Sequence, residues 1–160
     1  MAANNDELDR LLAAGLKASG QTVGTAESCT GGGIAFRLTA MPGCSAYFAG
    51  GIIAYANQVK EHVLDIQAEV LEQVGAVSEE VAANLAENAR KLLSCDLAVS
   101  TTGIAGPGGG SEHKPIGLVF IGAACEGHTV VRRFVFDGDR AAVREQAVNE
   151  ALLLLISLLK

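Results

Sequence analysis

The chain is poor in aromatic residues and has no dense run of basic ones. It contains no tryptophan, and aromatic residues make up 4% of its 160 residues, so few rings are available for stacking on single-stranded nucleic acid. The formal net charge of −6 and the lack of a Lys- or Arg-rich stretch argue against a duplex as partner. We therefore expect no nucleic acid among the partners of this protein.

Targeting and metal-binding patterns are lacking as well. The opening "MAANNDELDR" has neither the basic start nor the apolar core of a signal peptide, and the longest apolar run, residues 151–159, is too short to cross a bilayer. The four cysteines form no C-x-x-C pair, which favours reduced thiols over disulfides or a zinc site. We expect a cytoplasmic protein with no membrane partner, no metal and no cofactor.

Strand-like and helix-like patterns alternate along the chain. Helices are expected over residues 4–20, 30–40, 75–95 and 139–160, with short helical pieces in 57–75. Strands are expected over 21–27, 50–58 and 96–103, and residues 116–138 predict an antiparallel hairpin that turns at 126–128. Gly20 suits a left-handed helix end, and Ser78 suits an N-cap. Together these elements predict one domain, residues 1–160, with three α/β/α layers and a mixed, mostly parallel sheet.

The stretch "TAESCTGGG" places Ser28 where a strand gives way to a helix. Ligands gather at such carboxyl ends of strands, and the following helix would direct free N–H groups near Thr30 to Gly32 toward them. The glycines allow a ligand to approach the backbone closely, so an anion or the oxyanion of an acyl-transfer intermediate would fit. A plain tight turn with a small capping serine explains the same residues equally well.

The neighbouring thiol of Cys29 is a second candidate nucleophile. It would need a histidine nearby, and none of the three histidines lies in a recognisable partner pattern. A cysteine beside a glycine run is more often a small buried residue, so Ser28 is preferred.

A serine nucleophile needs a base, and without a histidine–acid pair the remaining class is lysine. Lys60 follows the strand expected over 50–58 and would enter the site from the end of that strand, with its pKa lowered by burial. Tyr55, placed on the strand itself, would relay a proton or orient the ammonium group. The alternatives are a solvated surface lysine and a core tyrosine with a wet hydroxyl.

A second glycine-rich stretch, "STTGIAGPGGGSEHKP", follows the strand at 96–103. Such a loop is able to wrap a phosphate or a sugar, and it is equally compatible with a flexible surface loop. Arg140 lies in the first turn of the last expected helix, where a cation opposes the helix dipole. That position indicates either an anionic substrate group or a surface salt bridge.

Five stretches occur together: "TAESCTGG", "YAN" with Lys60 three residues on, "GAVSEE", "TGIAGPGGGSEHKPIG" and "GDR" before a helix. In this order they resemble the CinA C-terminal domain family, which includes the nicotinamide-nucleotide amidases. The resemblance covers nearly the whole chain. It implies hydrolysis of the carboxamide of nicotinamide mononucleotide (NMN) to nicotinic acid mononucleotide and ammonia, without a metal. Longer members carry an N-terminal domain linked to pyrophosphatase activity, which we do not expect of this chain.

By similarity, Ser28 maps to the nucleophile, Lys60 to the base and Tyr55 to an assisting group. Thr102 and Arg140 map to further active-site positions. From the residues we add the backbone of the turn after Ser28 for the amide oxygen, and Arg140 with the second glycine stretch for the phosphate. The expected substrate contacts are thus Cys29, Thr30, Gly31, Gly32, Thr102, Gly103, Gly106 and Arg140.

Two other functions fit the same patterns. One is a non-catalytic module that binds a nucleotide or a sugar phosphate through its glycine loops. The other is a serine amidase or esterase acting on a different small amide. The hairpin and the apolar last helix leave surfaces that can pair, so we expect a homo-oligomer.

Overall fold

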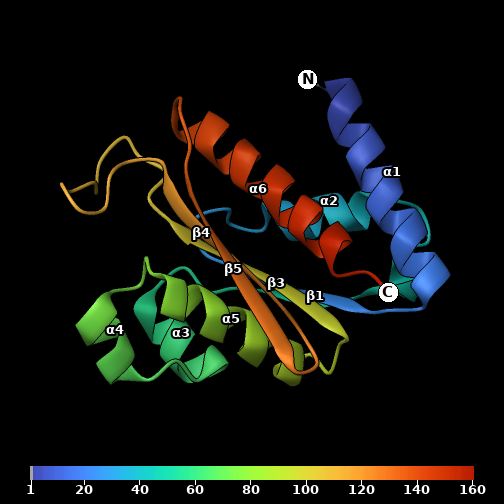
Figure 1. The fold of residues 1–160 in the computed structure, drawn as a ribbon, viewed down its shortest axis with the longest axis horizontal. Helices are drawn as coiled ribbons and strands as arrows, with labels where there is room; N and C mark the ends of the chain where they lie inside the picture. The colour runs from blue at the N-terminus through green and yellow to red at the C-terminus, as the bar shows by residue number, and fades with distance from the viewer. Residues whose placement is uncertain (1) are drawn as a thin grey trace.

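The computed structural model describes residues 2–160, with side chains from residue 5 onward, and is built on a five-stranded sheet (Figure 1). The strand order is β2-β1-β3-β4-β5. β1 pairs in parallel with β2 and β3, whereas β4 runs antiparallel to β3 and to β5. Four strands therefore share one direction, which confirms the expected mixed, mostly parallel sheet with one hairpin. The strands are β1 (Val23–Glu27), β2 (Phe48–Ile53), β3 (Leu97–Gly103), β4 (Leu118–Cys125) and β5 (His128–Val135).

Helices cover both faces of the sheet, and each face has its own apolar cluster. In Figure 1, α1 (Ala2–Ser19), α2 (Gly33–Ala40) and α6 (Arg140–Ser157) lie on one side. The other side holds α3 (Asn57–Leu64), α4 (Ala68–Val74) and α5 (Glu79–Leu92). Leu16 and Leu152 belong to the first cluster, and Leu64 and Leu85 belong to the second. The three-layer architecture follows from this packing: α2 and α6 contact the sheet from one side and α5 from the other, while α1 packs on α6 and α2, and α3 and α4 pack on α5.

Local signals at several element ends are confirmed. The Ser78 hydroxyl caps α5 by accepting a hydrogen bond from the backbone N–H of Val81 at 3.3 Å. Gly20 ends α1 with a φ of 68°, in the left-handed region that favours glycine. All four cysteines are free thiols. None of the helices within residues 2–160 is long and apolar enough to cross a bilayer.

Two expected boundaries beside Ser28 were wrong. β2 ends at Ile53, not at residue 58, because α3 already begins at Asn57 and the backbone of Ala56 is its N-cap. Helix α2 begins at Gly33 and not at Thr30. The reason is that Gly31 and Gly32 have φ values of 59° and 97°, which a right-handed helix does not accommodate. The residues between β1 and α2 therefore form a distinct turn.

Candidate active site

Ser28 lies directly beyond the carboxyl end of β1. In the sheet register, Glu27 is opposite Ile53 of β2 and Thr101 of β3, so the serine emerges between the two neighbouring parallel strands. Its backbone N–H donates to the carbonyl of Thr101 at 3.0 Å, and only 9% of the residue is exposed. The strand-to-helix position expected for the serine is confirmed. Its hydroxyl is held in a largely enclosed place.

Lys60 brings its amine to this hydroxyl. The distance between Lys60 Nζ and Ser28 Oγ is 3.3 Å, and Lys60 is only 1% exposed. The amine also donates to the carbonyl oxygens of Ala54 at 2.7 Å and Tyr55 at 3.0 Å. The expectation that Lys60 arrives from the end of a strand was wrong: it belongs to α3, and the turn between β2 and α3 folds its side chain back. The surface-lysine alternative is excluded.

The environment of Lys60 lowers the pKa of its amine. Burial lowers the pKa of the Lys60 amine below its ordinary value of 10.5, and the nearby Cys29 acts weakly in the opposite direction. None of the amine's hydrogen bonds within the described chain goes to a carboxylate. The amine is the donor in all three contacts, to Ser28 Oγ and to the two carbonyls. On deprotonation, an amine that kept its two N–H groups on the carbonyls would have a lone pair available for the serine hydroxyl.

Tyr55 contributes differently from the expectation. It lies beyond the end of β2, and its side chain is 57% exposed, so it is neither a strand residue nor a core residue. Its main-chain carbonyl contacts the Lys60 amine, whereas its hydroxyl accepts a hydrogen bond from Arg140 at 3.0 Å. The backbone therefore orients the lysine, and the phenol faces another part of the site.

The thiol of Cys29 is buried, and burial raises its pKa to about 11. A thiol with so high a pKa remains protonated at neutral pH and is a poor nucleophile. Next to it, the hydroxyl of Thr30 donates to the carboxylate of Glu27 at 2.6 Å and lies 2.7 Å from the hydroxyl of Thr101. Cys29 and Thr30 thus support the turn with their side chains turned inward.

Glu27 is a buried carboxylate that the sequence interpretation missed. Its oxygens accept hydrogen bonds from the backbone N–H groups of Gly32 at 3.1 Å, Ile34 at 3.0 Å and Ala35 at 2.8 Å. The expectation of free N–H groups at Gly31 and Gly32 was therefore wrong, since Gly31 also donates, to the carbonyl of Ser28. An acidic residue just ahead of a helix start was the available signal, because carboxylates favour that end of the helix dipole.

Arg144 of α6 was missed too, and it holds the other side of the turn. Its Nε donates to the carbonyl of Cys29 at 3.2 Å, and a terminal guanidinium nitrogen donates to the carbonyl of Thr30 at 2.9 Å. Only a periodic last helix was visible at this position in the sequence. No local pattern connects residue 144 with residues 29 and 30.

Three expected substrate contacts lie at the edge of this arrangement. Arg140 donates to the carbonyl of Gly106 at 2.9 Å, and both residues line a cavity of about 480 Å³ to which Arg144 also contributes. A Cβ at Gly103 would lie 2.7 Å from the carbonyl of Leu118, so the close packing of β3 on β4 accounts for that glycine. Tyr55 connects this cavity to the Ser28–Lys60 pair, because its hydroxyl accepts from Arg140 and its main-chain carbonyl accepts from Lys60.

The hydrogen bond of the Thr102 side chain leads away from the serine turn, which is formed by residues 28–32. Its hydroxyl is buried and donates to the carbonyl of Ala76, between α4 and α5, at 2.7 Å. Successive residues of a strand point to opposite faces, and Thr101 already reaches the turn through Thr30. An active-site role for Thr102 remains a prediction. Across residues 2–160, no group of three His, Cys, Asp or Glu side chains is placed to hold a metal ion.

Comparison with known proteins gives the family. A model of the CinA C-terminal domain matches residues 5–159. The chain belongs to the CinA C-terminal domain family. A CinA-like protein of Parasynechococcus marenigrum is 49% identical over 152 residues, which cover 92% of this chain and 36% of that protein. For a CinA-like protein of Citrifermentans bemidjiense the identity is 48% over 151 residues, covering 94% and 36%.

Solved CinA structures share the fold over its full extent. The competence/damage inducible protein CihA from Agrobacterium tumefaciens superposes with a TM-score of 0.94 at 39% identity, covering 98% of this chain and 96% of that one. A CinA superfamily protein from Klebsiella pneumoniae gives 0.93 at 35% identity, covering 97% of each chain. The CinA chain described here spans about a third of the length of the curated relatives named above.

Proposed function

We propose that this CinA domain is an amidase that hydrolyses the carboxamide of NMN to nicotinic acid mononucleotide and ammonia. The observation that carries the proposal is the buried Lys60 amine 3.3 Å from Ser28 Oγ, with its pKa lowered by burial. A serine beside a neutral amine is an activated nucleophile for acyl transfer. The choice of NMN rests on the resemblance of the site motifs to the nicotinamide-nucleotide amidases.

In the proposed reaction, Ser28 Oγ attacks the amide carbon while Lys60 Nζ takes the serine proton. The C–N bond then breaks as Lys60 returns that proton to the leaving nitrogen, which departs as ammonia. Water next attacks the acyl-serine ester, with Lys60 again accepting a proton. Release of the carboxylic acid restores the serine hydroxyl, so one water is consumed for each ammonia formed.

The amide oxygen needs hydrogen-bond donors as it becomes an oxyanion. The N–H groups of Gly32, Ile34 and Ala35 are occupied by Glu27, so the donors we assign are the N–H groups of Cys29 and Thr30. An N–H on the residue after the nucleophile serves this purpose in other serine hydrolases.

The charges of NMN fit the surroundings of this pair. The cationic pyridinium disfavours protonation of Lys60 and would lower the pKa of its amine further on binding. Arg140 and the cavity it shares with Gly106 offer a cation and a backbone loop for the phosphate. This division of roles places the reacting amide between the serine turn and α3.

The test is ammonia release from NMN by the wild-type chain beside Ser28→Ala. Loss of the nucleophile should lower kcat by roughly 10⁶-fold, as in other serine hydrolases, with the melting temperature unchanged. Cys29→Ser is the matched control and should keep activity, because the buried thiol does not ionise at neutral pH. Turnover that survives Ser28→Ala would contradict the proposal. Binding of NMN without any ammonia from the wild type would favour a nucleotide-binding module instead.

A further inference from the structure

Nearly every backbone polar group in the turn between β1 and α2 has a partner inside the protein. Glu27 accepts three N–H groups from the start of α2. The N–H of Gly31 donates to the carbonyl of Ser28 at 3.0 Å, and the N–H of Gly33 donates to the carbonyl of Thr30 at 3.1 Å. Within the described chain, no hydrogen bond uses the N–H of Cys29 or of Thr30. These two N–H groups belong to the residues that directly follow Ser28 in the sequence.

We propose that Arg144 is a positioning residue that directs these two N–H groups toward the reacting carbonyl oxygen. The proposal rests on the amidase function proposed above. Its guanidinium holds the carbonyls of Cys29 and Thr30 through Nε and a terminal nitrogen, at 3.2 and 2.9 Å. Arg144 belongs to α6. Among the described residues of that helix, it alone forms hydrogen bonds with the serine turn.

The geometry of the peptide bond turns these contacts into control of the donors. In a trans peptide the C=O and the following N–H point in opposite directions. Fixing the Cys29 carbonyl toward Arg144 therefore directs the N–H of Thr30 away from it. Fixing the Thr30 carbonyl sets the N–H of Gly31, which holds the Ser28 carbonyl and so sets the N–H of Cys29.

An arginine suits this task because its planar fork holds two acceptors at once. A lysine at the same place retains the charge but loses the fixed spacing of the two donors. Glu27 restrains the start of α2 from the opposite side, so the two residues clamp the turn between them. The alternative is that Arg144 binds the phosphate directly, since it also lines the cavity beside Arg140.

The experiment measures kcat and KM for Arg144→Lys and Arg144→Ala with NMN and with nicotinamide riboside, which lacks the phosphate. We expect kcat to fall by about 10²–10³-fold, as for loss of an oxyanion donor, by the same factor for both substrates and with KM little changed. Guanidinium at non-denaturing concentration should restore part of the rate of Arg144→Ala. The acidic limb of the pH–rate profile should stay in place, because Lys60 is untouched.

Arg37→Lys is the matched control. Arg37 is a similarly half-buried arginine of α2 that pairs with Asp9 of α1 instead of with the serine turn, so kcat should be retained. Melting temperatures check folding, and Arg144→Lys carries the test if Arg144→Ala does not fold. An increase in KM for NMN alone, with kcat retained, would show a phosphate ligand and overturn the proposal.

A second substrate separates this proposal from the proposed function. Acylation of Ser28 by 4-nitrophenyl acetate, followed by mass spectrometry, uses the same donors without NMN. If the wild type is acylated but releases no ammonia from NMN, the amidase proposal fails, and slower acylation of the Arg144 variants still supports the positioning role. If Arg144→Lys is acylated as fast as the wild type, the positioning role is wrong whatever the substrate.

Discussion

Two glycine-rich segments of this protein look alike in sequence and differ in structure. The serine turn (residues 28–32) is clamped by the buried carboxylate of Glu27 and by Arg144. The glycine loop (residues 104–117) extends from the body of the molecule between β3 and β4, and most of its middle is exposed (Figure 1).

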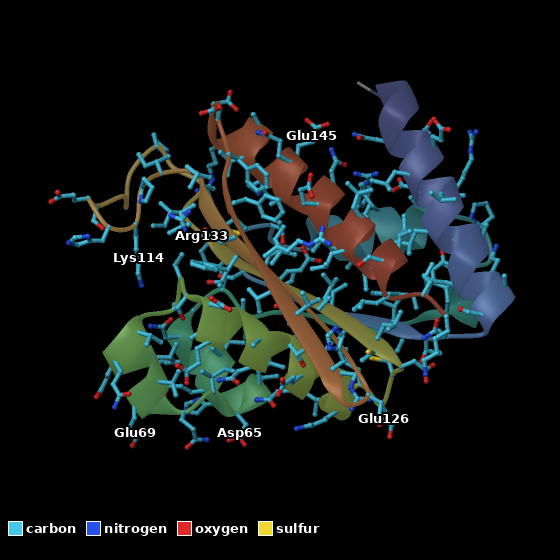
Figure 2. The ribbon with its side chains drawn as sticks, viewed as in Figure 1. Asp65, Glu69, Lys114, Glu126, Arg133 and Glu145 are labelled. Atoms are coloured by element: carbon cyan, nitrogen blue, oxygen red, sulfur yellow. The ribbon has the colours of Figure 1, made fainter. Side chains whose placement is uncertain are left out.

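The glycine loop is tied down at few points. Two side-chain hydrogen bonds connect it to other elements. Arg140 of α6 donates to the carbonyl of Gly106, and Lys114 of the loop donates to the carbonyl of Val74 in α4 at 2.7 Å. Figure 2 shows Lys114 at the end of the loop that faces α4 and α5. Glycine permits either a tight turn or a loose loop. Here the turn is fixed by Glu27, which directly precedes it, and by Arg144 of α6.

The largest effect expected from this comparison separates Lys60, which contacts the serine turn, from Lys114 of the glycine loop. Lys60 and Lys114 both donate to backbone carbonyls, but only Lys60 reaches Ser28. Lys60→Met should lower kcat for NMN by about 10²–10⁴-fold through loss of a general base. Lys114→Met should leave kcat within a few-fold of the wild type. Steady-state ammonia release measures both, and equal losses would remove the distinction.

The pH dependence adds a direction to the Lys60 prediction. Because burial lowers the pKa of Lys60 in the folded chain, the wild-type rate should fall on acidification, and a flat profile from about pH 5 to 9 would contradict its role as base. Between the folded pKa and 10.5 the unfolded chain binds the extra proton. The free energy of unfolding should therefore rise with pH across that window, more steeply for the wild type than for Lys60→Met.

The next effect compares two glutamates. Glu27→Gln places an amide NH₂ against backbone donors that need an acceptor, so we expect a loss of about 2–3 kcal/mol in the free energy of unfolding. Glu112→Gln, in the exposed part of the glycine loop, should change it by less than about 0.5 kcal/mol. Urea unfolding of both variants gives the two values. If Glu27→Gln left the free energy of unfolding unchanged, the turn would not depend on the Glu27 carboxylate.

The smallest effect compares two glycines. At Gly32 the φ is 97° and a Cβ would lie 3.2 Å from Ile53 Cδ1, so Gly32→Ala should cost about 1–2 kcal/mol. At Gly108 a Cβ would meet nothing within 4 Å, and Gly108→Ala should be neutral or stabilising by up to about 1 kcal/mol. Thermal unfolding of both variants measures the difference. An equal loss of stability in the two would show that both glycines are conformationally required.

Local sequence signals were sufficient for much of the fold. The helical spacing in α5 and its Ser78 cap were predictable, because capping and periodicity depend on residues a few positions apart. The tight turn at Gly127 predicted the hairpin for the same reason. The end of β2 was misplaced because the apolar residues continue past Ile53 through residues 54–56. In the structure the chain leaves the sheet there and enters α3.

The site was predictable only in part. Ser28 and Lys60 were selected because a strand-to-helix turn and a lysine after a buried strand are visible in sequence, and the family resemblance joined them. Glu27 was overlooked because β1 is buried throughout and offers no polar alternation as a signal. The hydroxyl of Tyr55 was directed to the wrong partner, since Arg140 lies 85 positions further along the chain.

The sequence by itself determined which segments become strands and helices, and which residue types are available for acyl transfer. Only the tertiary structure decided that the amine of Lys60 is buried against Ser28 and that Arg144 meets the turn 114 positions before it. The physical reason is that periodicity, caps and turns arise from neighbouring residues. Desolvation and long-range hydrogen bonds exist only after the layers have packed.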